Sequence, residues 1–253
     1  MLLEEEILVM PEPKKDIITQ LQKEILALQG FKNFATNKVS PVDLGPIETA
    51  FPNGCFPEAG IHEFICTAPQ HEAATNGFIA TLMAAFMRKG GASVWIGASG
   101  KLFPPALKIF GIEPDKIIFI DLRKEKDILW VMEEVLKCNG IALVVGELPE
   151  LSFTSSRRLQ LAVEQSRLTG FIIRNNPRNL NVNACISRWR ITPLPTGIEN
   201  DMPGIGFPRW NIELLKIRNG KPGSWQMEWS AGRFRFISPL VESIQQEQKR
   251  KTG

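Results

Sequence analysis

Strands and helices alternate through the middle of this chain, and the alternation restricts the fold more than any other feature of the sequence. Short apolar runs alternate with segments whose apolar residues recur at helical spacing. The runs are IHEFIC, SVWIGA, KIIFID, IALVVGEL and FIIR, at residues 61–66, 93–98, 116–121, 141–148 and 171–174. They are apolar on both faces, as strands are when helices cover both sides of a sheet. The pattern predicts an α/β fold with a mostly parallel central sheet.

The segments between these runs have helical patterns and suitable end signals. We expect helices at about residues 43–51, 73–88, 102–111, 125–139 and 154–168. In the segment 102–111, Pro104 and Pro105 fit the first turn, where a missing N–H costs nothing. Thr154 is a good residue for capping the last helix, because its hydroxyl can accept a free N–H of the first turn.

The pattern changes after residue 175. The segment 175–184 is polar, and we expect it to be mobile. The runs CISRWRI, RWNIELLKI and SWQMEWSA read as further strands, at 185–191, 209–217 and 224–231. NGKPGS, at 219–224, is a turn signal between the last two, so these strands should extend the sheet in antiparallel fashion.

The two ends of the chain read as separate from the core. Residues 1–42 contain a helical stripe followed by a linker rich in Pro, Gly and Asn, and we interpret them as an N-terminal helical arm. On this arm, Ile18, Leu21 and Ile25 are candidate oligomer contacts. Residues 43–240 form the core, and residues 241–253 form a polar tail that we expect to be disordered.

Composition excludes several classes of function. No apolar run reaches the ~20 residues that a membrane span needs, and the N-terminus carries an acidic cluster where a secretory signal would be basic, so we expect a cytoplasmic protein. The four cysteines show no metal-ligand spacing. Only two histidines are present, which leaves little for acid–base chemistry. We expect His62 to be hydrogen-bonded near the surface.

Charge is distributed unevenly. Residues 1–150 hold 14 Lys/Arg against 20 Asp/Glu, whereas residues 151–240 hold 13 against 5 and four of the six tryptophans. Such a region is typical of a nucleic-acid surface, of a protein interface, or of a solvated basic face over a tryptophan-containing core. The candidate residues for partner or DNA binding are Arg157, Arg188, Arg190, Arg209, Trp210, Arg233 and Arg235.

The connection after the first core strand is where a parallel sheet of this kind would bind a nucleotide phosphate. A phosphate-binding loop there would read G-x-x-x-x-G-K-[ST]. The segment 66–77 has no glycine before Gly77 and no lysine, and Glu72 would repel a phosphate. We interpret it as a vestigial phosphate loop. Its candidate residues are Thr67, Gln70, His71, Thr75 and Asn76.

The acidic residues of an ATPase are missing as well. In IALVVGEL, Gly146 stands where a magnesium-binding aspartate would fall, and Glu147 would point to the opposite side of a regular strand. The second strand ends at residues 96–100 without a carboxylate that could orient water. We therefore expect no ATP hydrolysis, no catalytic residue, no cofactor and no metal.

The residues that carry a family resemblance lie between about 43 and 230. FPNGCFPEAGIHEF, the degenerate connection and SVWIGA resemble the RecA core of bacterial recombinases. LWVMEEVLKCNGIALVVGEL, SFTSSRRLQLAVEQSRLTGFIIR, SRWRI and GFPRWNIELLKIRNGKPGSWQMEW resemble the ImuA family within that superfamily. The arm and the tail carry less of the match.

This resemblance implies a RecA-like three-layer core with an antiparallel C-terminal extension. It also implies an accessory protein of mutagenic translesion DNA synthesis in the SOS response, without catalytic activity. Its partners would be an ImuB-type, Y-family polymerase-like protein and an error-prone replicative-type polymerase subunit. RecA and single-stranded DNA are further candidate partners.

Two other functions stay open at this point. One is inhibition of cell division, because SulA proteins belong to the same broad group, although they are shorter and lack the PGSW segment at residues 222–225. The other is a RecA-like protein that binds nucleotide or DNA on its own. Filamentous growth on overexpression would indicate the first, and ATP or DNA binding by the isolated chain would indicate the second.

Overall fold

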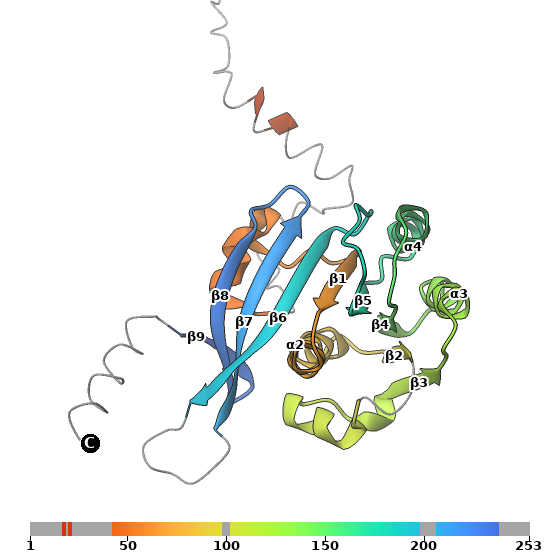
Figure 1. Ribbon diagram of the computed structural model, residues 1–253. Helices are drawn as coiled ribbons and strands as arrows, with labels where there is room; N and C mark the ends of the chain where they lie inside the picture. Colours follow the sequence, from red (N-terminus) through yellow and green to blue (C-terminus); the bar gives the residue numbers. More distant parts are fainter. Residues whose placement is uncertain (1–16, 19, 22–41, 98–101, 198–205, 238–253) are drawn as a thin grey trace, which may run out of the picture. The chain divides into compact units, whose positions relative to one another are not determined.

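The computed structural model describes residues 17, 18, 20, 21, 42–97, 102–197 and 206–237 (Figure 1). The chain divides into two units, Met1–Lys38 and Val39–Gly253, and each is considered by itself. The division expected from the sequence, after residue 42, stays a prediction.

The first unit contains four described residues, all helical, and the expected arm stays a prediction. Of its candidate contacts, Ile18 is 55% and Leu21 is 52% exposed. Ile25 lies outside the described residues, as does the tail at 241–253.

A sheet of nine strands runs through the described residues of the second unit, in the order β3-β2-β4-β5-β1-β6-β7-β8-β9 (Figure 1). The strands are β1 Ile61–Cys66, β2 Ala92–Gly97, β3 Ile117–Asp121, β4 Ile141–Glu147, β5 Gly170–Asn175, β6 Ser187–Gly197, β7 Phe207–Ile217, β8 Gly223–Ser230 and β9 Arg233–Phe236. Neighbours from β3 to β6 are parallel, and neighbours from β6 to β9 are antiparallel. The predicted mostly parallel sheet with an antiparallel C-terminal extension is therefore confirmed.

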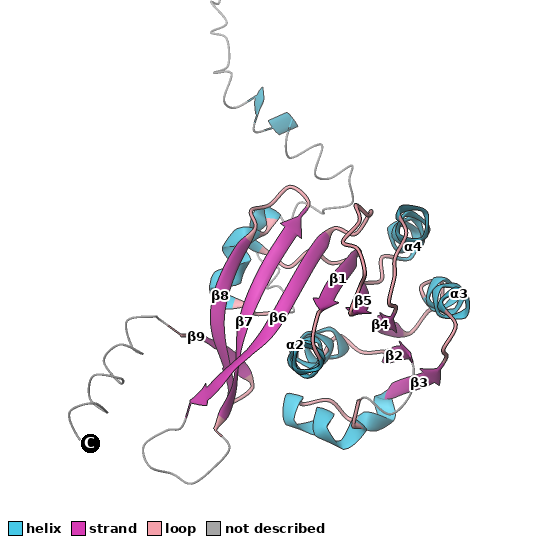
Figure 2. Cartoon of the chain, in the orientation of Figure 1, coloured by secondary structure: helices cyan, strands magenta, loops and turns pink. Residues whose placement is uncertain are grey.

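Helices cover both faces of the parallel region (Figure 2). The α-helices are α2 Pro69–Met87, α3 Glu125–Val135 and α4 Phe153–Ser166, and the 3-10 helices are η1 Gly45–Ala50, η2 Pro52–Gly54, η3 Pro104–Phe110 and η4 Pro114–Lys116. One hydrophobic core lies between α2, η1 and the face that presents Phe64 and Trp189, and the other lies between α3, α4 and the face that presents Ile61 and Ile172. Within the described ranges, no helix is long and apolar enough to cross a membrane.

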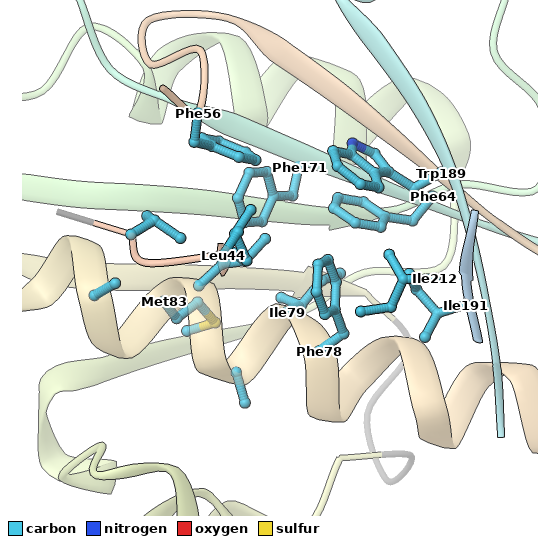
Figure 3. Packing of buried hydrophobic residues seen from close by; sticks show 14 of the residues in the cluster. Leu44, Phe56, Phe64, Phe78, Ile79, Met83, Phe171, Trp189, Ile191 and Ile212 are labelled. Carbon is cyan, nitrogen blue, oxygen red and sulfur yellow. The ribbon is translucent and has the colours of Figure 1, made fainter. Parts of the chain in front are cut away.

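Aromatic rings dominate the core under α2 (Figure 3). The indole of Trp189 is fully buried and lies 6.3 Å from the ring of Phe64 and 5.9 Å from the ring of Phe78, between centroids. Phe64 comes from β1, Trp189 from β6 and Phe78 from α2, so this cluster joins both regions of the sheet to the helix. Offset and edge-on ring pairs of this kind add to the free energy that burial provides.

Three local predictions differ from the structure. Helix α2 begins at Pro69, four residues before the expected start, because a proline at the first helical position is pre-shaped for a helix. Helix α4 is capped by Ser152, whose hydroxyl accepts the N–H of Ser155 at 3.0 Å, and not by Thr154. The last strand, Arg233–Phe236, was not expected, because its four residues are too few to give a periodic signal.

Hydrogen bonds hold the segment that we expected to be mobile. The side chain of Arg174 donates to the carbonyl of Asn179 at 2.9 Å, and the N–H of Arg178 donates to Glu150 at 2.8 Å. The N–H of Ala184 donates to the hydroxyl of Ser156 at 2.9 Å. A segment bonded at both ends and in the middle is positioned by the core rather than free in solvent.

Candidate functional site

The connection between β1 and α2 leaves little room for a phosphate loop. Strand β1 ends at Cys66 and α2 begins at Pro69, so only Thr67 and Ala68 lie between them. Ala68 occupies the N-cap position without a side-chain cap. A phosphate-binding loop needs several consecutive residues whose N–H groups curl around the anion. Two residues cannot form that curve, so the predicted loop at 66–77 is mostly helix.

The candidate residues of the vestigial loop are thereby separated. The hydroxyl of Thr67 and Nδ1 of His71 lie 3.1 Å apart at the start of the helix. Thr75 is buried, and its hydroxyl accepts the thiol of Cys66 at 3.3 Å. Gln70 and Asn76 border a pocket on the side of α2 that faces η3. Thr67 and His71 therefore lie side by side, Gln70 and Asn76 share the border of one pocket, and Thr75 lies in the core.

The residues between β1 and the first turns of α2 do not fit the phosphates of a nucleoside triphosphate. The stretch from Thr67 to Gly77 contains no lysine or arginine to offset phosphate charge, and Glu72 lies in the first turn of α2. The helix start could still offer N–H groups to an anion, but Pro69 lacks one of them.

The end of β4 also differs from an ATPase core. A side chain at Gly146 would clash with the sulfur of Met132 from α3, so the helix occupies the place of a metal-binding carboxylate. Glu147 projects to the opposite face, where it accepts the indole N–H of Trp95 at 2.8 Å. The opposite orientations of these neighbours follow from the regular strand, as expected from the sequence.

His62 is fully buried, which corrects the expectation of a place near the surface. The indole N–H of Trp189 donates to the hydroxyl of Ser187 at 2.6 Å, and that hydroxyl lies 2.7 Å from Nδ1 of His62. On the other side, Nε2 lies 2.9 Å from the carbonyl of Pro57. Because the carbonyl can only accept, Nε2 carries the proton and Nδ1 accepts from Ser187. Burial lowers the pKa of His62 to about 3, so the ring is neutral.

A buried ionic cluster on the opposite face of the sheet was missed by the sequence analysis. Glu63 and Arg174 are both fully buried, and their side chains bond at 2.9 Å. Arg188 bonds to the other carboxylate oxygen of Glu63 at 2.5 Å, and Arg174 also bonds to Glu150 at 2.7 Å. We name Glu63, Arg174, Arg188 and Glu150 the ionic cluster. Its signal in the sequence is a charged residue inside IHEFIC and another inside FIIR, two runs that are otherwise apolar.

The structure does not bring the seven binding candidates together. Arg188 belongs to the ionic cluster and is 13% exposed at its side chain, and Trp210 is 4% exposed and packs in the core. Arg157 lies on α4, 3.8 Å from Glu164. Arg233 lines a pocket beside Phe234. These four do not belong to one surface.

The other three candidates share a face of the antiparallel strands. Arg190 lies 3.7 Å from Glu213 across β6 and β7, and Arg209 bonds to Glu228 at 2.8 Å across β7 and β8. Arg235 stands opposite Glu228 in β9. We name these five residues the polar face. The core that contains α2 and η1 lies on the other side of the same strands.

Ion pairs therefore use much of the positive charge of residues 151–240. Arg158 bonds to Glu133 at 2.6 Å. In the ionic cluster, Arg174 and Arg188 both pair with Glu63, which belongs to the acidic portion of the chain. The uneven charge along the sequence arises to some extent because an acidic and a basic region neutralise each other.

The geometry defines a class of protein. No family model matches the chain. Among solved structures, the crystal structure of the RadB recombinase is similar at a TM-score of 0.52 and 12% identity, over 74% of this chain and 94% of that chain. At this identity the likeness shows the fold alone. The molecule has a RecA-like α/β fold in which the phosphate loop is replaced by a direct strand-to-helix connection.

Sequence relatives narrow the class to one family. The chain is 35% identical over 213 residues to Protein ImuA of Caulobacter vibrioides, in strain NA1000 / CB15N and in strain ATCC 19089 / CIP 103742 / CB 15. The match covers 78% of this chain and 87% of each relative. The chain belongs to the ImuA family. The resemblance found in the sequence is thus confirmed, and it supports in general terms a role in the ImuA–ImuB mutagenesis system.

Proposed function

We propose that this protein is a non-catalytic adaptor of a mutagenic translesion DNA synthesis complex, where it binds an ImuB-type protein. The observation that carries the proposal is the two-residue connection between β1 and α2, which leaves no room for a phosphate loop and no lysine in it. In addition, Met132 of α3 packs where a side chain at Gly146, near the end of β4, would lie. A RecA-like core without these groups can still act through the surfaces with which it binds other proteins. Membership of the ImuA family supports the choice of partner.

The proposed complex includes an error-prone replicative-type polymerase subunit. RecA and single-stranded DNA are further partners that the proposal allows. The polar face supports direct contact with protein better than with DNA, because Glu213 and Glu228 stand among its arginines. A carboxylate beside each of two arginines would repel a phosphate backbone.

Copurification tests the proposal. The tagged full chain, expressed with an ImuB-type protein and the polymerase subunit, should retain the ImuB-type protein through washes at physiological salt. The isolated chain should show no shift in its thermal midpoint with ATP and magnesium, because a ligand that does not bind the native state cannot stabilise it. Failure to retain the ImuB-type protein, together with clear stabilisation by ATP, would show that the chain acts as a nucleotide-binding protein.

A control separates the adaptor from the other candidates. A single-stranded oligonucleotide titrated into the isolated chain should bind weakly, and binding that falls steeply with salt would indicate a DNA-binding role. Filamentous growth on overexpression would support inhibition of cell division. The double variant Arg190→Glu/Arg235→Glu, which leaves the core untouched, tests whether the polar face contributes to partner binding.

A further inference from the structure

Two pockets lie end to end along one side of α2. The first, of about 480 Å³, lies between α2, η3 and the ends of β6 and β7. The second, of about 510 Å³, lies between α2, η3 and the start of β9. Phe110 of η3 lines both pockets. We name the two pockets together the α2 groove.

The spacing of α2 residues shows that the two pockets follow one face of the helix. Most lining residues are three or four positions from another, which keeps them on one side of an α-helix. These residues are Gln70, Ala73, Ala74, Gly77, Thr81, Ala84, Ala85 and Arg88. From Gln70 to Arg88 the groove follows about 18 residues of helix, or about 27 Å at about 1.5 Å per residue. This length matches a peptide segment rather than a small molecule.

The walls of the groove are apolar and fixed by packing. A side chain at Gly77 would place its Cβ 3.0 Å from the indole of Trp210, so the ring packs directly against the helix. Two large apolar side chains remain exposed on η3 and just before it, beside the groove: Ile109 at 72% and Phe103 at 68%. Exposed apolar residues next to an apolar hollow mark a surface that excludes water when a partner covers it.

One end of the groove is basic. Arg88, Lys108 and Arg233 line the second pocket, with Asp43 as the one acidic residue in its lining among those described. Among the described residues, no carboxylate lies within ion-pair distance of Lys108 or Arg233. The first pocket has neutral polar residues at its border, Gln70 and Asn76, and its Arg209 is already paired with Glu228. The groove is thus complementary to a segment in which apolar residues adjoin acidic ones.

We propose that the α2 groove binds a segment of the ImuB-type partner in which apolar side chains adjoin acidic residues. The inference rests on the proposed function, since it names how that partner is held. Apolar side chains fill the first pocket, and carboxylates meet Lys108 and Arg233 at the second. A single-stranded nucleic acid fits less well, because Arg209, the one basic residue in the described lining of the first pocket, is already paired with Glu228 and would not attract a phosphate backbone there.

Calorimetric titration of the full chain with the intact ImuB-type protein tests this proposal. Ala73 is exposed and borders the first pocket, so Ala73→Trp should occupy the apolar space without disturbing the core. Lys108→Glu/Arg233→Glu reverses the charge of the second pocket. Each variant should weaken binding by at least about tenfold, equivalent to about 1.4 kcal/mol. The wild-type affinity should also fall as salt is raised.

Matched controls lie away from the groove. Val182 is 80% exposed, so Val182→Trp adds the same ring elsewhere, and Lys116→Glu reverses an exposed charge at the end of η4. Both should bind as the wild type does, and the thermal midpoints of all variants should agree. A wild-type complex whose affinity is unchanged in both groove variants would overturn the groove while leaving the adaptor role standing. No wild-type complex at all would overturn the adaptor role and the groove with it.

A single-stranded oligonucleotide provides the remaining comparison. If it bound the wild type and lost affinity in Lys108→Glu/Arg233→Glu while the ImuB-type protein still bound normally, the groove would serve nucleic acid and the proposal would be wrong. Overlapping peptides of the ImuB-type protein, probed with the full chain, should give signal where apolar residues adjoin acidic ones. Signal confined to basic peptides would equally contradict it.

Discussion

The parallel and antiparallel regions of the sheet place their charged residues differently. In the parallel region, Glu63 and Arg174 lie inside strands, fully buried and bonded to each other. In the antiparallel region, Arg190 and Glu213 share a half-exposed face. The difference shows that a stretch of sequence rich in arginine does not have to form a positively charged surface. Some of its arginines neutralise carboxylates of the other region, and only the remainder can meet a partner.

The largest expected effect concerns the ionic cluster. Glu63→Ala leaves Arg174 and Arg188 without the carboxylate that both contact, and Arg174 is fully buried. Removing one member of a buried pair typically costs about 3–5 kcal/mol. Urea unfolding of the wild type and the variant measures the difference. A loss below about 1 kcal/mol would mean that this cluster behaves like a surface pair, and the contrast between the two regions would disappear.

His62 should make the stability of the protein depend on pH. Its pKa is about 3 in the folded state, below the ordinary value of 6.5, so between these values the unfolded chain binds more protons. Stability is then fully present above pH 6.5 and falls as the pH drops toward 3. From about pH 7.5 to about pH 5 the loss should be about 2 kcal/mol. Urea unfolding of His62→Gln at both pH values should show a loss smaller by about this amount, and an equal loss in both proteins would contradict the assignment.

Two neighbouring hydroxyl residues at the start of α4 should differ in their effect on stability. Ser152→Ala removes the acceptor for the N–H of Ser155 and should cost about 1 kcal/mol. Thr154→Ala, two positions later and already inside the helix, should change stability by less than about 0.5 kcal/mol. Thermal unfolding measures the loss of stability in each variant. A larger loss in Thr154→Ala than in Ser152→Ala would show that Thr154 is the cap.

The smallest effect belongs to the polar face. A double-mutant cycle between Arg190 and Glu213, whose charged atoms lie 3.7 Å apart, should give a coupling of about 0.2–1 kcal/mol that shrinks in high salt. A coupling as large as that expected for Glu63 would show that the polar face is ordered as firmly as the buried cluster. The comparison of the two regions would then need another basis.

The parallel core is predicted well from the sequence because its two signals, short apolar runs for strands and helical spacing of apolar residues for helices, are both local. Strand β1 was expected at its observed bounds, and the other four apolar runs fall within one or two residues of theirs. The start of α2 was predicted four residues too late, because residues 66–77 occupy the place of a phosphate loop in a RecA-like core, whereas Pro69 favours a helix. The strand at Arg233–Phe236 was missed because its four residues are too short for a periodic signal.

The candidate site was less predictable, for a physical reason. Loss of the lysine and the aspartate can be read directly, but the partner of a charged residue cannot. Arg188 and Arg190 are two positions apart in the sequence, and one bonds to buried Glu63 while the other lies near half-exposed Glu213. The α2 groove is similar, since η3 and β9 meet α2 only in three dimensions.

The place of β1 in the sheet has a consequence for how the chain acquires its structure during synthesis. Ile61 pairs with Gly170 and His62 pairs with Ser187, so both neighbours of this strand leave the ribosome more than 100 residues later. Strands β2, β3 and β4 can pair with one another well before that. Until β5 and β6 emerge, the apolar residues of β1 have no sheet to join and stay exposed to chaperones and to aggregation. A chain that ends before residue 187 would therefore lack β6, one of the two strands that pair with β1.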